Sequence, residues 1–225
     1  MTAGLLAANG ILTALLEREA SGEGQWVQTS LLEAQIFLLD FQAARYTMNK
    51  EVPGQAGNNH PTNVPTGVFK SRDGYVTMAP MTSMLDKFWM ALGAPDLCAR
   101  PEYDTIEKRR ENREAMNADI EVYSATKDTL EWVDIMNEVG VPCGPIYTLD
   151  QTFNDPQVQH LGIAQTVESA KLGPTTLVGQ PLHLSRTPNQ MISAAPEVGE
   201  HTDEVLAEMG YSTDEIAAFR DQAVV

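Results

Sequence analysis

The residues of this chain that could do chemistry gather in one stretch with little apolar content, residues 54–67, GQAGNNHPTNVPTG. Gly57, Asn58 and Asn59 can all present backbone N–H groups, and His60 carries an imidazole ring. Such a stretch cannot bury itself, so it predicts an exposed loop held by its neighbours. Loops held on rigid scaffolds often carry binding groups. Composition by itself equally describes an ordinary Gly/Asn/Pro connection, which is the commoner case.

A second rigid segment, residues 140–147 (GVPCGPIY), contains two glycines and two prolines and predicts a turn that enters a strand. It holds Cys143, one of two cysteines in the chain. No histidine lies near Cys143 in the sequence to lower the pKa of its thiol. The segment therefore favours a packed structural thiol over a nucleophile.

Several kinds of catalytic site are not supported by the sequence. The chain has no His-Glu-x-x-His pattern, no phosphate-binding glycine loop before a helix and no Gly-x-Ser-x-Gly elbow. Its four histidines are scattered: His60, His160, His183 and His201. Metal catalysis and serine hydrolysis are therefore not predicted. Three aspartates stand where an N-cap or first-turn carboxylate belongs, which suffices to explain them: Asp86, Asp128 and Asp155.

The composition sets further limits on partners and compartment. The formal charge of −16 argues against nucleic-acid binding, which needs clustered Lys and Arg. No run reaches the ~18 apolar residues that a membrane span requires. Two cysteines far apart, without metal-ligand spacing, are typical of a reducing cytosol. We expect a cytoplasmic protein without a nucleic-acid or membrane partner.

The elements before the loop follow from helical periodicity and caps. Residues 3–20 predict a helix closed by Gly22, and its broad set of leucines predicts burial on more than one side. Residues 23–29 predict a turn and a short strand. The capping box that starts at Ser30 then predicts one long helix ending near residues 48–49. Because the first helix has no capping residue before it, we expect the chain to be a fragment.

The elements after the loop begin with a hairpin, in which residues 67–70 and 75–79 flank a Ser-Arg-Asp-Gly turn. Ser83 predicts the N-cap of a helix that stops at residues 93–95. Residues 103–125 form a charged helical pattern that includes a Lys-Arg-Arg run and a further arginine. This pattern favours a solvated face with ion pairs over a basic binding patch.

The last third of the chain is punctuated by further cap signals. A capping box at residues 128–131 predicts a helix that ends at Gly140, and an Asp-Pro pair at 155–156 predicts another. The remaining predicted elements are strands at 163–167, 175–178 and 182–184, and helices at 202–209 and 212–222.

Several pieces of the sequence, in one order, resemble a known family. They are Gly4–Leu15, Ser21–Ala34, Gly57–Pro61, Pro65–Gly67, Asp73–Gly74, Gly140–Pro145, Asn154–Pro156, Gly199–Leu206 and Val224–Val225. Together they resemble the class III CoA-transferases, whose members include formyl-CoA and carnitine CoA-transferases and the related α-methylacyl-CoA racemases. The resemblance covers essentially the whole chain.

The resemblance implies an α/β protein with the class III CoA-transferase fold, here a partial Rossmann-like large domain plus a small α/β domain. Residues 1–50 would supply a helix, a strand and a long helix of the large domain. Residues 51–165 would form the small domain, and residues 166–225 would return to the large domain with the C-terminal helices. Members of the family form interlocked dimers, so the resemblance also implies a homodimer.

The resemblance implies transfer of coenzyme A between an acyl-CoA and a carboxylic acid, without a metal, through an aspartyl-CoA thioester. The family's nucleophilic aspartate lies immediately before the segment that starts here at Met1, so we expect no catalytic residue within the chain. The resemblance implies a substrate and CoA loop at Gly57, Asn58, Asn59, His60, Pro65 and Gly67. It also implies an acyl-pocket backbone at Cys143, Gly144 and Pro145.

Two alternatives to the transferase remain open. Racemases of this family use acid and base groups, among them a glutamate after the hairpin, and residues 75–91 contain Asp86 but no glutamate. Proton abstraction beside a thioester needs two such groups, so the sequence favours a transferase over a racemase. The other alternative is a non-catalytic fragment or assembly subunit.

Overall fold

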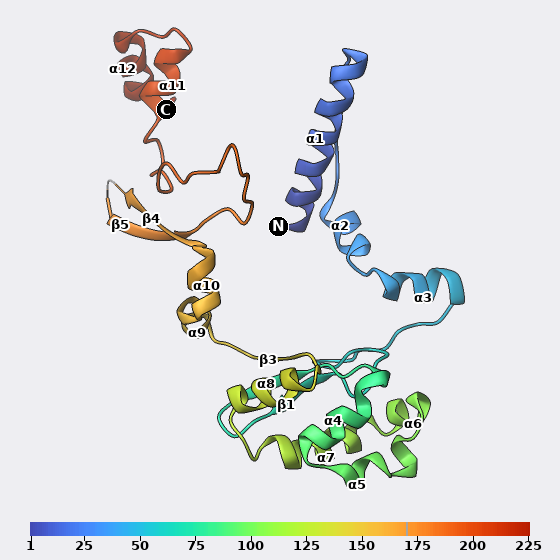
Figure 1. Cartoon of the computed structure of the whole chain (residues 1–225). Helices are drawn as coiled ribbons and strands as arrows, with labels where there is room; N and C mark the ends of the chain where they lie inside the picture. The colour runs from blue at the N-terminus through green and yellow to red at the C-terminus, as the bar shows by residue number, and fades with distance from the viewer. Residues whose placement is uncertain (170) are drawn as a thin grey trace. The chain divides into compact units, whose positions relative to one another are not determined.

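The computed structural model of the chain describes residues 1–169 and 171–225. These residues form two compact units, Met1–Ile146 and Tyr147–Val225, which we describe separately (Figure 1). The first unit contains an N-terminal helical segment and a small sheet covered by helices. Among the described residues, none of the helices has both the length and the apolar character that crossing a membrane requires.

The N-terminal helix α1 (Thr2–Ser21) ends at Gly22, which adopts the left-handed conformation with a φ of 78°. The expected burial of its apolar residues is wrong for this chain, because α1 has no buried residue and Leu16 is 75% exposed. The expected strand at residues 23–29 is also wrong. That segment is extended but pairs with no strand among the described residues. Periodicity reports which residues are apolar, and it does not report what covers them.

The expected long second helix is two helices, α2 (Leu31–Phe37) and α3 (Phe41–Asn49). The N-cap at Ser30 that opens α2 is confirmed, since the Ser30 hydroxyl accepts a hydrogen bond from the Glu33 amide at 3.1 Å. The Glu33 carboxylate accepts from the Ser30 hydroxyl at 2.7 Å and not from the Ser30 amide, so the expected capping box is only half formed. The break falls at Asp40, whose φ is 46°. A residue at positive φ cannot continue a right-handed helix, and the unbroken run of apolar residues through this point hides the break from a periodicity analysis.

The sheet of the first unit has three antiparallel strands in the order β1-β2-β3. The hairpin of β1 (Gly67–Lys70) and β2 (Tyr75–Met78) is confirmed, with Lys70 opposite Tyr75 across the turn. The third strand, β3 (Cys143–Pro145), pairs with β2 and confirms that the Gly/Pro segment enters a strand. Residues separated by more than 60 positions in the chain are therefore neighbours on this sheet.

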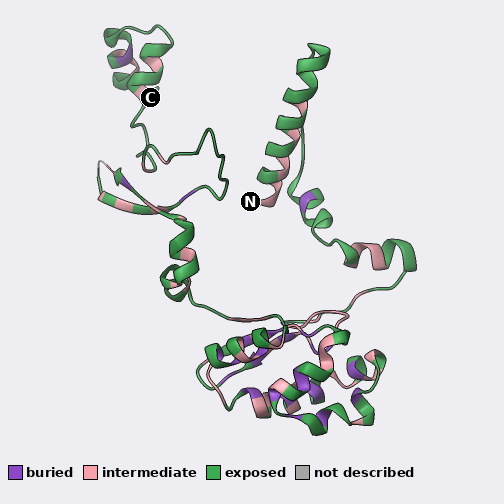
Figure 2. Cartoon of the chain, in the orientation of Figure 1, coloured by how far each residue is buried: buried purple, intermediate pink, exposed green. Residues whose placement is uncertain are grey.

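Helices and two short 3-10 turns pack on this sheet. They are η1 (Thr82–Met84), α4 (Leu85–Leu92), α5 (Pro95–Cys98), η2 (Pro101–Tyr103), α6 (Ile106–Glu111), α7 (Arg113–Ser124) and α8 (Thr129–Glu138). Figure 2 shows that buried residues gather where these helices meet the sheet. The core includes Phe69 and Met78 from the sheet and Phe88, Met116 and Trp132 from the helices. Burial of this apolar surface is the main stabilising contribution to the first unit.

Two expected helix boundaries in this region are wrong. Ser83 lies inside the 3-10 turn η1, and the N-cap of α4 is Met84, whose side chain makes no capping hydrogen bond. The charged stretch divides at Asn112 into α6 and α7. Asn112 is the residue between the two helices and has a φ of −102°. The predicted stop of α4 is confirmed, because Gly93 adopts a left-handed conformation.

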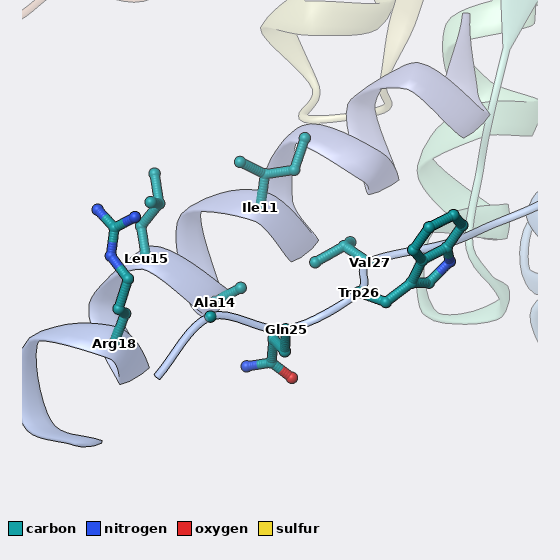
Figure 3. A pocket seen from close by; sticks show the side chains of 8 residues that line it. Ile11, Ala14, Leu15, Arg18, Gln25, Trp26 and Val27 are labelled. Atoms are coloured by element: carbon teal, nitrogen blue, oxygen red, sulfur yellow. The ribbon is translucent and has the colours of Figure 1, made fainter. Parts of the chain in front are cut away.

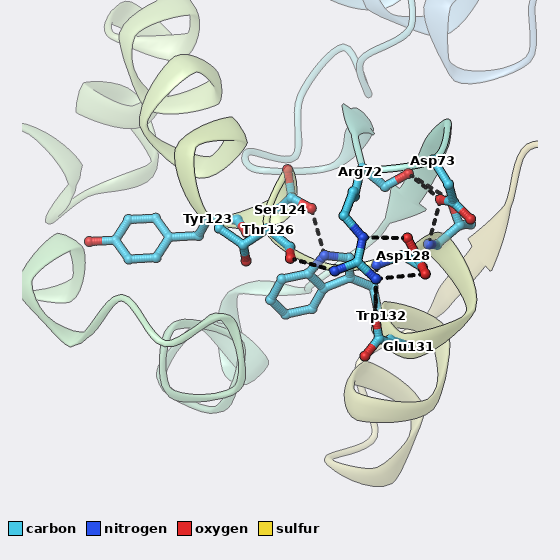
Figure 4. A network of polar contacts seen from close by, with 10 residues as sticks. Arg72, Asp73, Tyr123, Ser124, Thr126, Asp128, Glu131 and Trp132 are labelled. Atoms are coloured by element: carbon cyan, nitrogen blue, oxygen red, sulfur yellow. Dashed lines mark hydrogen bonds and ion pairs between the residues drawn. The ribbon is translucent and has the colours of Figure 1, made fainter.

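A polar network joins the hairpin turn to the start of α8 (Figure 4). One Asp73 oxygen accepts hydrogen bonds from the Thr129 amide and the Thr129 hydroxyl, both at 2.8 Å. Arg72 donates to Asp128 at 2.7 Å and pairs with Glu131 at 3.2 Å. The capping box formed by Asp128 and Glu131 is confirmed. This network fixes the turn end of the hairpin on a helix that precedes β3 in the chain.

Because of this network, the stability of the protein should depend on the ionisation of Asp73. Hydrogen bonds from Thr129 lower the pKa of the Asp73 carboxyl. Its stabilising contribution is therefore complete above the unfolded pKa of about 3.9 and is lost as pH falls through the lower folded pKa. We expect urea unfolding of the wild type and of Asp73→Asn to give stabilities that converge as pH falls from 7 toward 3. A difference that stayed constant over this range would contradict the prediction.

The second unit begins with helices α9 (Leu149–Asn154) and α10 (Pro156–Leu161) and continues with the antiparallel hairpin of β4 (Ala164–Ser169) and β5 (Gly173–Val178). The predicted cap at Asp155 is confirmed, since its carboxylate accepts from the Gln157 amide at 2.8 Å. Residues 182–184 form no strand, so that prediction is wrong.

Two helices end the second unit, α11 (Thr202–Glu208) and α12 (Thr213–Asp221). The predicted capping box at the start of α12 is confirmed, with Ser212 and Glu215 bonded to each other's backbone N–H groups. The domain division expected from the resemblance, at residues 1–50, 51–165 and 166–225, stays a prediction, because compactness alone divides the chain between residues 146 and 147.

Candidate functional site

The loop expected to bind substrate closes on itself before it enters β1. The His60 amide donates to the Thr66 carbonyl at 2.8 Å, and the Val68 amide donates to the Asn58 carbonyl at 3.2 Å. Asn59 forms a bridge with Gly67. The expected exposure holds for Gly57 and Asn58 but not for the second half of the loop, where Val64, Pro65 and Gly67 are buried. These hydrogen bonds replace the apolar contacts that the sequence of the loop cannot supply.

Two positions of this loop require glycine, each for a different structural reason. Gly57 has a φ of 58°, a conformation that side chains disfavour. At Gly67 the reason is space, since a Cβ atom there would lie 2.6 Å from Oδ1 of Asn59. That Asn59 oxygen accepts a hydrogen bond from Asn117 of α7 at 2.9 Å. The close approach of Gly67 therefore keeps the first half of the loop anchored to a helix.

His60 is held by the backbone that follows it. Its Nδ1 atom lies 2.9 Å from the Asn63 amide nitrogen and 3.2 Å from the Thr62 amide nitrogen. Its ring lies parallel to the Phe41 ring of α3, with an angle of 8° and a centroid distance of 6.0 Å. One face and the Nδ1 edge of the His60 ring are therefore in a defined setting, although the chain around it carries few apolar side chains.

Three arginines of the charged stretch hold the loop, which sequence reasoning missed. Arg109 is buried, and its Nε donates to the Val64 carbonyl at 2.9 Å. Arg110 Nε donates to the Thr62 carbonyl at 2.8 Å. Arg113 donates to the carbonyls of His60 at 2.8 Å and Pro61 at 3.3 Å. The carbonyls that accept these hydrogen bonds lie in consecutive positions, 60 to 62, with a fourth at position 64.

The predicted ion-paired face is therefore wrong for these arginines. It is right for Lys108, which pairs with Asp104 at 3.7 Å. Burial lowers the pKa of the Arg109 and Arg113 guanidinium groups, and the nearby charge of Arg110 lowers that of Arg113 further. The only sequence signal was the run of basic residues. Nothing in that run indicates backbone carbonyls 45 to 53 positions away as partners.

The sheet brings the two predicted site segments to one end. Gly67 lies opposite Met78, and Met78 lies opposite Cys143, so the loop and the Gly/Pro segment are one strand apart. Thr77 links them, because its hydroxyl donates to the Gly67 carbonyl at 3.3 Å and its methyl carbon would lie 3.7 Å from a Cβ on Gly144. Sequence reasoning did not single out Thr77, since a threonine in a strand is ordinary.

Cys143 and Pro145 are the remaining residues of the predicted site, and both are half-buried on β3. Burial raises the pKa of the half-buried Cys143 thiol to about 11, so the thiol is protonated near neutral pH, as a packed thiol should be. Pro145 is half-buried opposite Val76. A role for Cys143, Gly144 and Pro145 as the backbone of an acyl pocket stays a prediction.

Two cavities of the first unit lie near the elements described. One, of ≈ 370 Å³, lies beside the loop and is lined by Arg45, Asn59, Arg110, Arg113 and Asn117 among others. The other, of ≈ 400 Å³, lies between α1 and the extended segment 24–27, where the side chains of Ile11, Leu15 and Val27 line it (Figure 3). The first has the polar groups that could bind an anion, and the second is mainly apolar. Within the described part of the chain, no group of three or more His, Cys, Asp and Glu side chains is placed to hold a metal ion.

Comparison with known proteins gives the chain a family. The model of "CoA-transferase family III" matches residues 1–202. The chain is 32% identical over 214 residues to a succinyl-CoA:mesaconate CoA-transferase of Haloarcula marismortui, covering 93% of this chain and 52% of that protein. It is 29% identical over 247 residues to a formyl-CoA:oxalate CoA-transferase of Rhodopseudomonas palustris, covering 99% of this chain and 58% of that protein. The chain thus spans about half the length of the curated relatives it matches.

Solved structures give the same answer for the fold. A CAIB/BAIF family protein from Brucella suis superposes with a TM-score of 0.75 at 26% identity, over 92% of this chain and 54% of that one. The protein Rv3272 from Mycobacterium tuberculosis superposes with a TM-score of 0.73 at 22% identity, over 90% of this chain and 53% of that one. The expected α/β class III CoA-transferase fold is confirmed. On its sequence and its structure, this chain belongs to CoA-transferase family III.

Proposed function

We propose that this chain is the C-terminal part of an acyl-CoA:carboxylate CoA-transferase that works through an aspartyl-CoA thioester. The observation that carries the proposal is the family match over residues 1–202, with relatives that are CoA-transferases about twice as long. The exposed apolar side chains of α1 also support it, because such side chains are normally covered by other parts of a protein.

In the proposed reaction, an aspartate carboxylate attacks the thioester carbonyl of the acyl-CoA and releases the CoA thiolate, leaving a mixed anhydride. The thiolate then attacks the aspartyl carbonyl and releases the acyl group as a carboxylate, which gives the aspartyl-CoA thioester. The acceptor carboxylate attacks that thioester and releases the CoA thiolate, which leaves a second mixed anhydride. The thiolate finally attacks the acceptor acyl carbon of this anhydride and frees the aspartate. We place this aspartate immediately before Met1. Dividing one exchange into acyl transfers is what covalent catalysis achieves.

Within this chain, the proposed contribution is the loop at the end of the sheet. Each acyl transfer develops negative charge on a carbonyl oxygen, which backbone N–H groups can stabilise. Gly57 and Asn58 are exposed residues, and among the described residues their amides donate no backbone hydrogen bond. We assign the substrate and CoA loop to these residues with Asn59, His60, Pro65 and Gly67, and the acyl-pocket backbone to residues 143–145.

The proposal extends to cofactor, assembly and compartment. Coenzyme A enters as the acyl-CoA substrate, and the proposed steps require no metal. We propose an interlocked homodimer in the cytoplasm, which the family resemblance supports. Size-exclusion chromatography with light scattering would test the dimer, since a mass near that of one chain would contradict it.

Restoring the upstream sequence tests the function. We expect the longer protein to exchange CoA between an acyl-CoA and a carboxylic acid, and the 225-residue chain to show no exchange. Turnover by the 225-residue chain would mean that the nucleophile is misplaced. Deuterium exchange at the α-carbon of the acyl group without CoA movement would instead indicate a racemase.

In the longer protein, His60→Ala should change kcat or KM. If both constants stayed unchanged, the loop would be an ordinary connection.

A further inference from the structure

The structure defines where the ring proton of His60 resides. A backbone N–H can only donate, so Nδ1, which faces the amides of Thr62 and Asn63 at 3.2 and 2.9 Å, is an acceptor. The neutral ring therefore carries its proton on Nε2. Among the described residues, Nε2 has no hydrogen-bond partner. Every buried side-chain nitrogen of these residues has a partner, so Nε2 is not a buried atom. The Nε2–H group is thus accessible and available as a donor.

Two peptide units connect this ring to two arginines. In a planar trans peptide, the C=O and the following N–H point in opposite directions. Arg113 donates to the Pro61 carbonyl at 3.3 Å, and the Thr62 amide of that same peptide faces Nδ1. Arg110 donates to the Thr62 carbonyl at 2.8 Å, and the Asn63 amide of that same peptide faces Nδ1. Each peptide therefore spans the distance from a guanidinium to the His60 ring.

The charges make this arrangement strong. A hydrogen bond from a cation to a carbonyl polarises the peptide and makes its N–H a better donor on the other side. Among the described residues, neither Arg110 nor Arg113 has an ion-pair partner. Both guanidiniums are instead bonded to the loop, and Arg113 also donates to the carbonyl of His60 itself at 2.8 Å.

We infer that Arg110 and Arg113 are positioning residues, which fix the His60 ring with Nδ1 as an acceptor so that it offers its Nε2–H to an oxygen atom of the substrate. The oxygen would belong to a carboxylate or a thioester carbonyl, and this part of the inference rests on the proposed function. Under this assignment His60 donates a hydrogen bond and takes no proton from the substrate. The positioning of the ring holds whatever the substrate is.

Nitrogen-15 NMR of the whole chain tests the positioning without any activity measurement. The chain has four histidines, so the His60 signals are assigned by their absence in His60→Asn. We expect only the Nε2–H tautomer of His60 in the wild type. Arg113→Gln and Arg110→Gln should make the Nδ1–H tautomer detectable. They should also speed hydrogen exchange of the Thr62 and Asn63 amides by about tenfold, because each variant loses a charge-assisted hydrogen bond to the loop.

The matched control for these variants is Lys108→Gln, which removes a charge from α6, the helix that carries Arg110, but no bond to the loop. It should leave the tautomer and the two exchange rates unchanged. Arg110→Lys should restore part of the exchange protection, because a lysine can still donate to the Thr62 carbonyl. A wild-type mixture of tautomers, or arginine variants that match the control, would overturn the positioning.

A titration tests the oxygen partner. We expect the His60 Nε2–H signal to shift when succinate or acetyl-CoA is added, with CoA and methylammonium as controls that lack the carboxylate and the thioester. A response to succinate identifies a carboxylate, and a response to acetyl-CoA but not CoA identifies a thioester carbonyl. A response to neither would overturn the substrate assignment. If the longer protein showed no CoA exchange, the proposed function would be wrong, whatever the response of His60. The two failures are therefore distinguishable.

Discussion

Replacing Arg109 with methionine should lower the free energy of unfolding by about 3 kcal/mol. Only 3% of this arginine is exposed, and it donates to the carbonyls of Val64, Tyr103 and Asp104. Methionine fills much of the same space but donates no hydrogen bond. A buried acceptor left without a partner costs roughly 1–3 kcal/mol. The carbonyls of Val64 and Tyr103 lose buried bonds here, and the Asp104 carbonyl loses a part-buried one. Urea unfolding followed by tryptophan fluorescence measures the change.

Lys108→Met is the control for Arg109→Met, since the two residues are adjacent on α6. The side chain of Lys108 is 45% exposed, and its ion pair with Asp104 is 3.7 Å long. Exposed pairs of this kind contribute little, so the change should stay within about 0.5 kcal/mol. If both variants lost the same stability, the effect would belong to α6 in general and not to the carbonyls bound by Arg109.

The other large effect should come from Trp132→Ala, which we expect to cost about 3–5 kcal/mol. Trp132 is fully buried in the core between α8 and the sheet. Its indole N–H donates to the Ser124 carbonyl at 2.7 Å, so the substitution leaves both a cavity and an unpaired carbonyl. Trp132→Phe fills most of the cavity and should show mainly the hydrogen-bond part, roughly 1 kcal/mol or more. Urea denaturation measures both variants.

Trp26→Ala provides the contrast for Trp132→Ala with the same change of side chain. Trp26 is 86% exposed in this chain, so its removal should change the free energy of unfolding by no more than about 0.5 kcal/mol. A loss comparable to that of Trp132→Ala would show that Trp26 is covered in solution. That outcome would be informative, because residues 1–49, which hold α1, α2 and α3, carry most of the exposed large apolar side chains of the first unit.

These effects bear on the candidate site because the loop has little core of its own. Its second half is buried at Val64, Pro65 and Gly67, and Arg109 holds the Val64 carbonyl. Its first half is held by Asn117 and by the Arg113 bonds to positions 60 and 61. The stability of the helices and the geometry of the loop are therefore linked, and loss of Arg109 should loosen both.

Local features were determined by the sequence alone. The hairpin at residues 67–78, the left-handed glycines after α1 and α4, and the caps at Ser30, Asp128 and Asp155 all formed as predicted. Each depends on residues a few positions apart, whose preferences act over one turn. The family was also determined by sequence, because its short motifs keep a fixed order along the chain.

Other features were decided only by the tertiary structure. They include the break at Asp40, the exposure of α1, the meeting of Gly67 and Cys143 at one sheet end, and the arginine bonds to the loop. A charged helical run shows which side chains are cationic, but it does not show whether they bind carboxylates, water or backbone carbonyls. That depends on which distant segment packs against the helix. The loop was visible from its composition, and the residues that hold it were not, because its partners are set by packing between elements far apart in the chain.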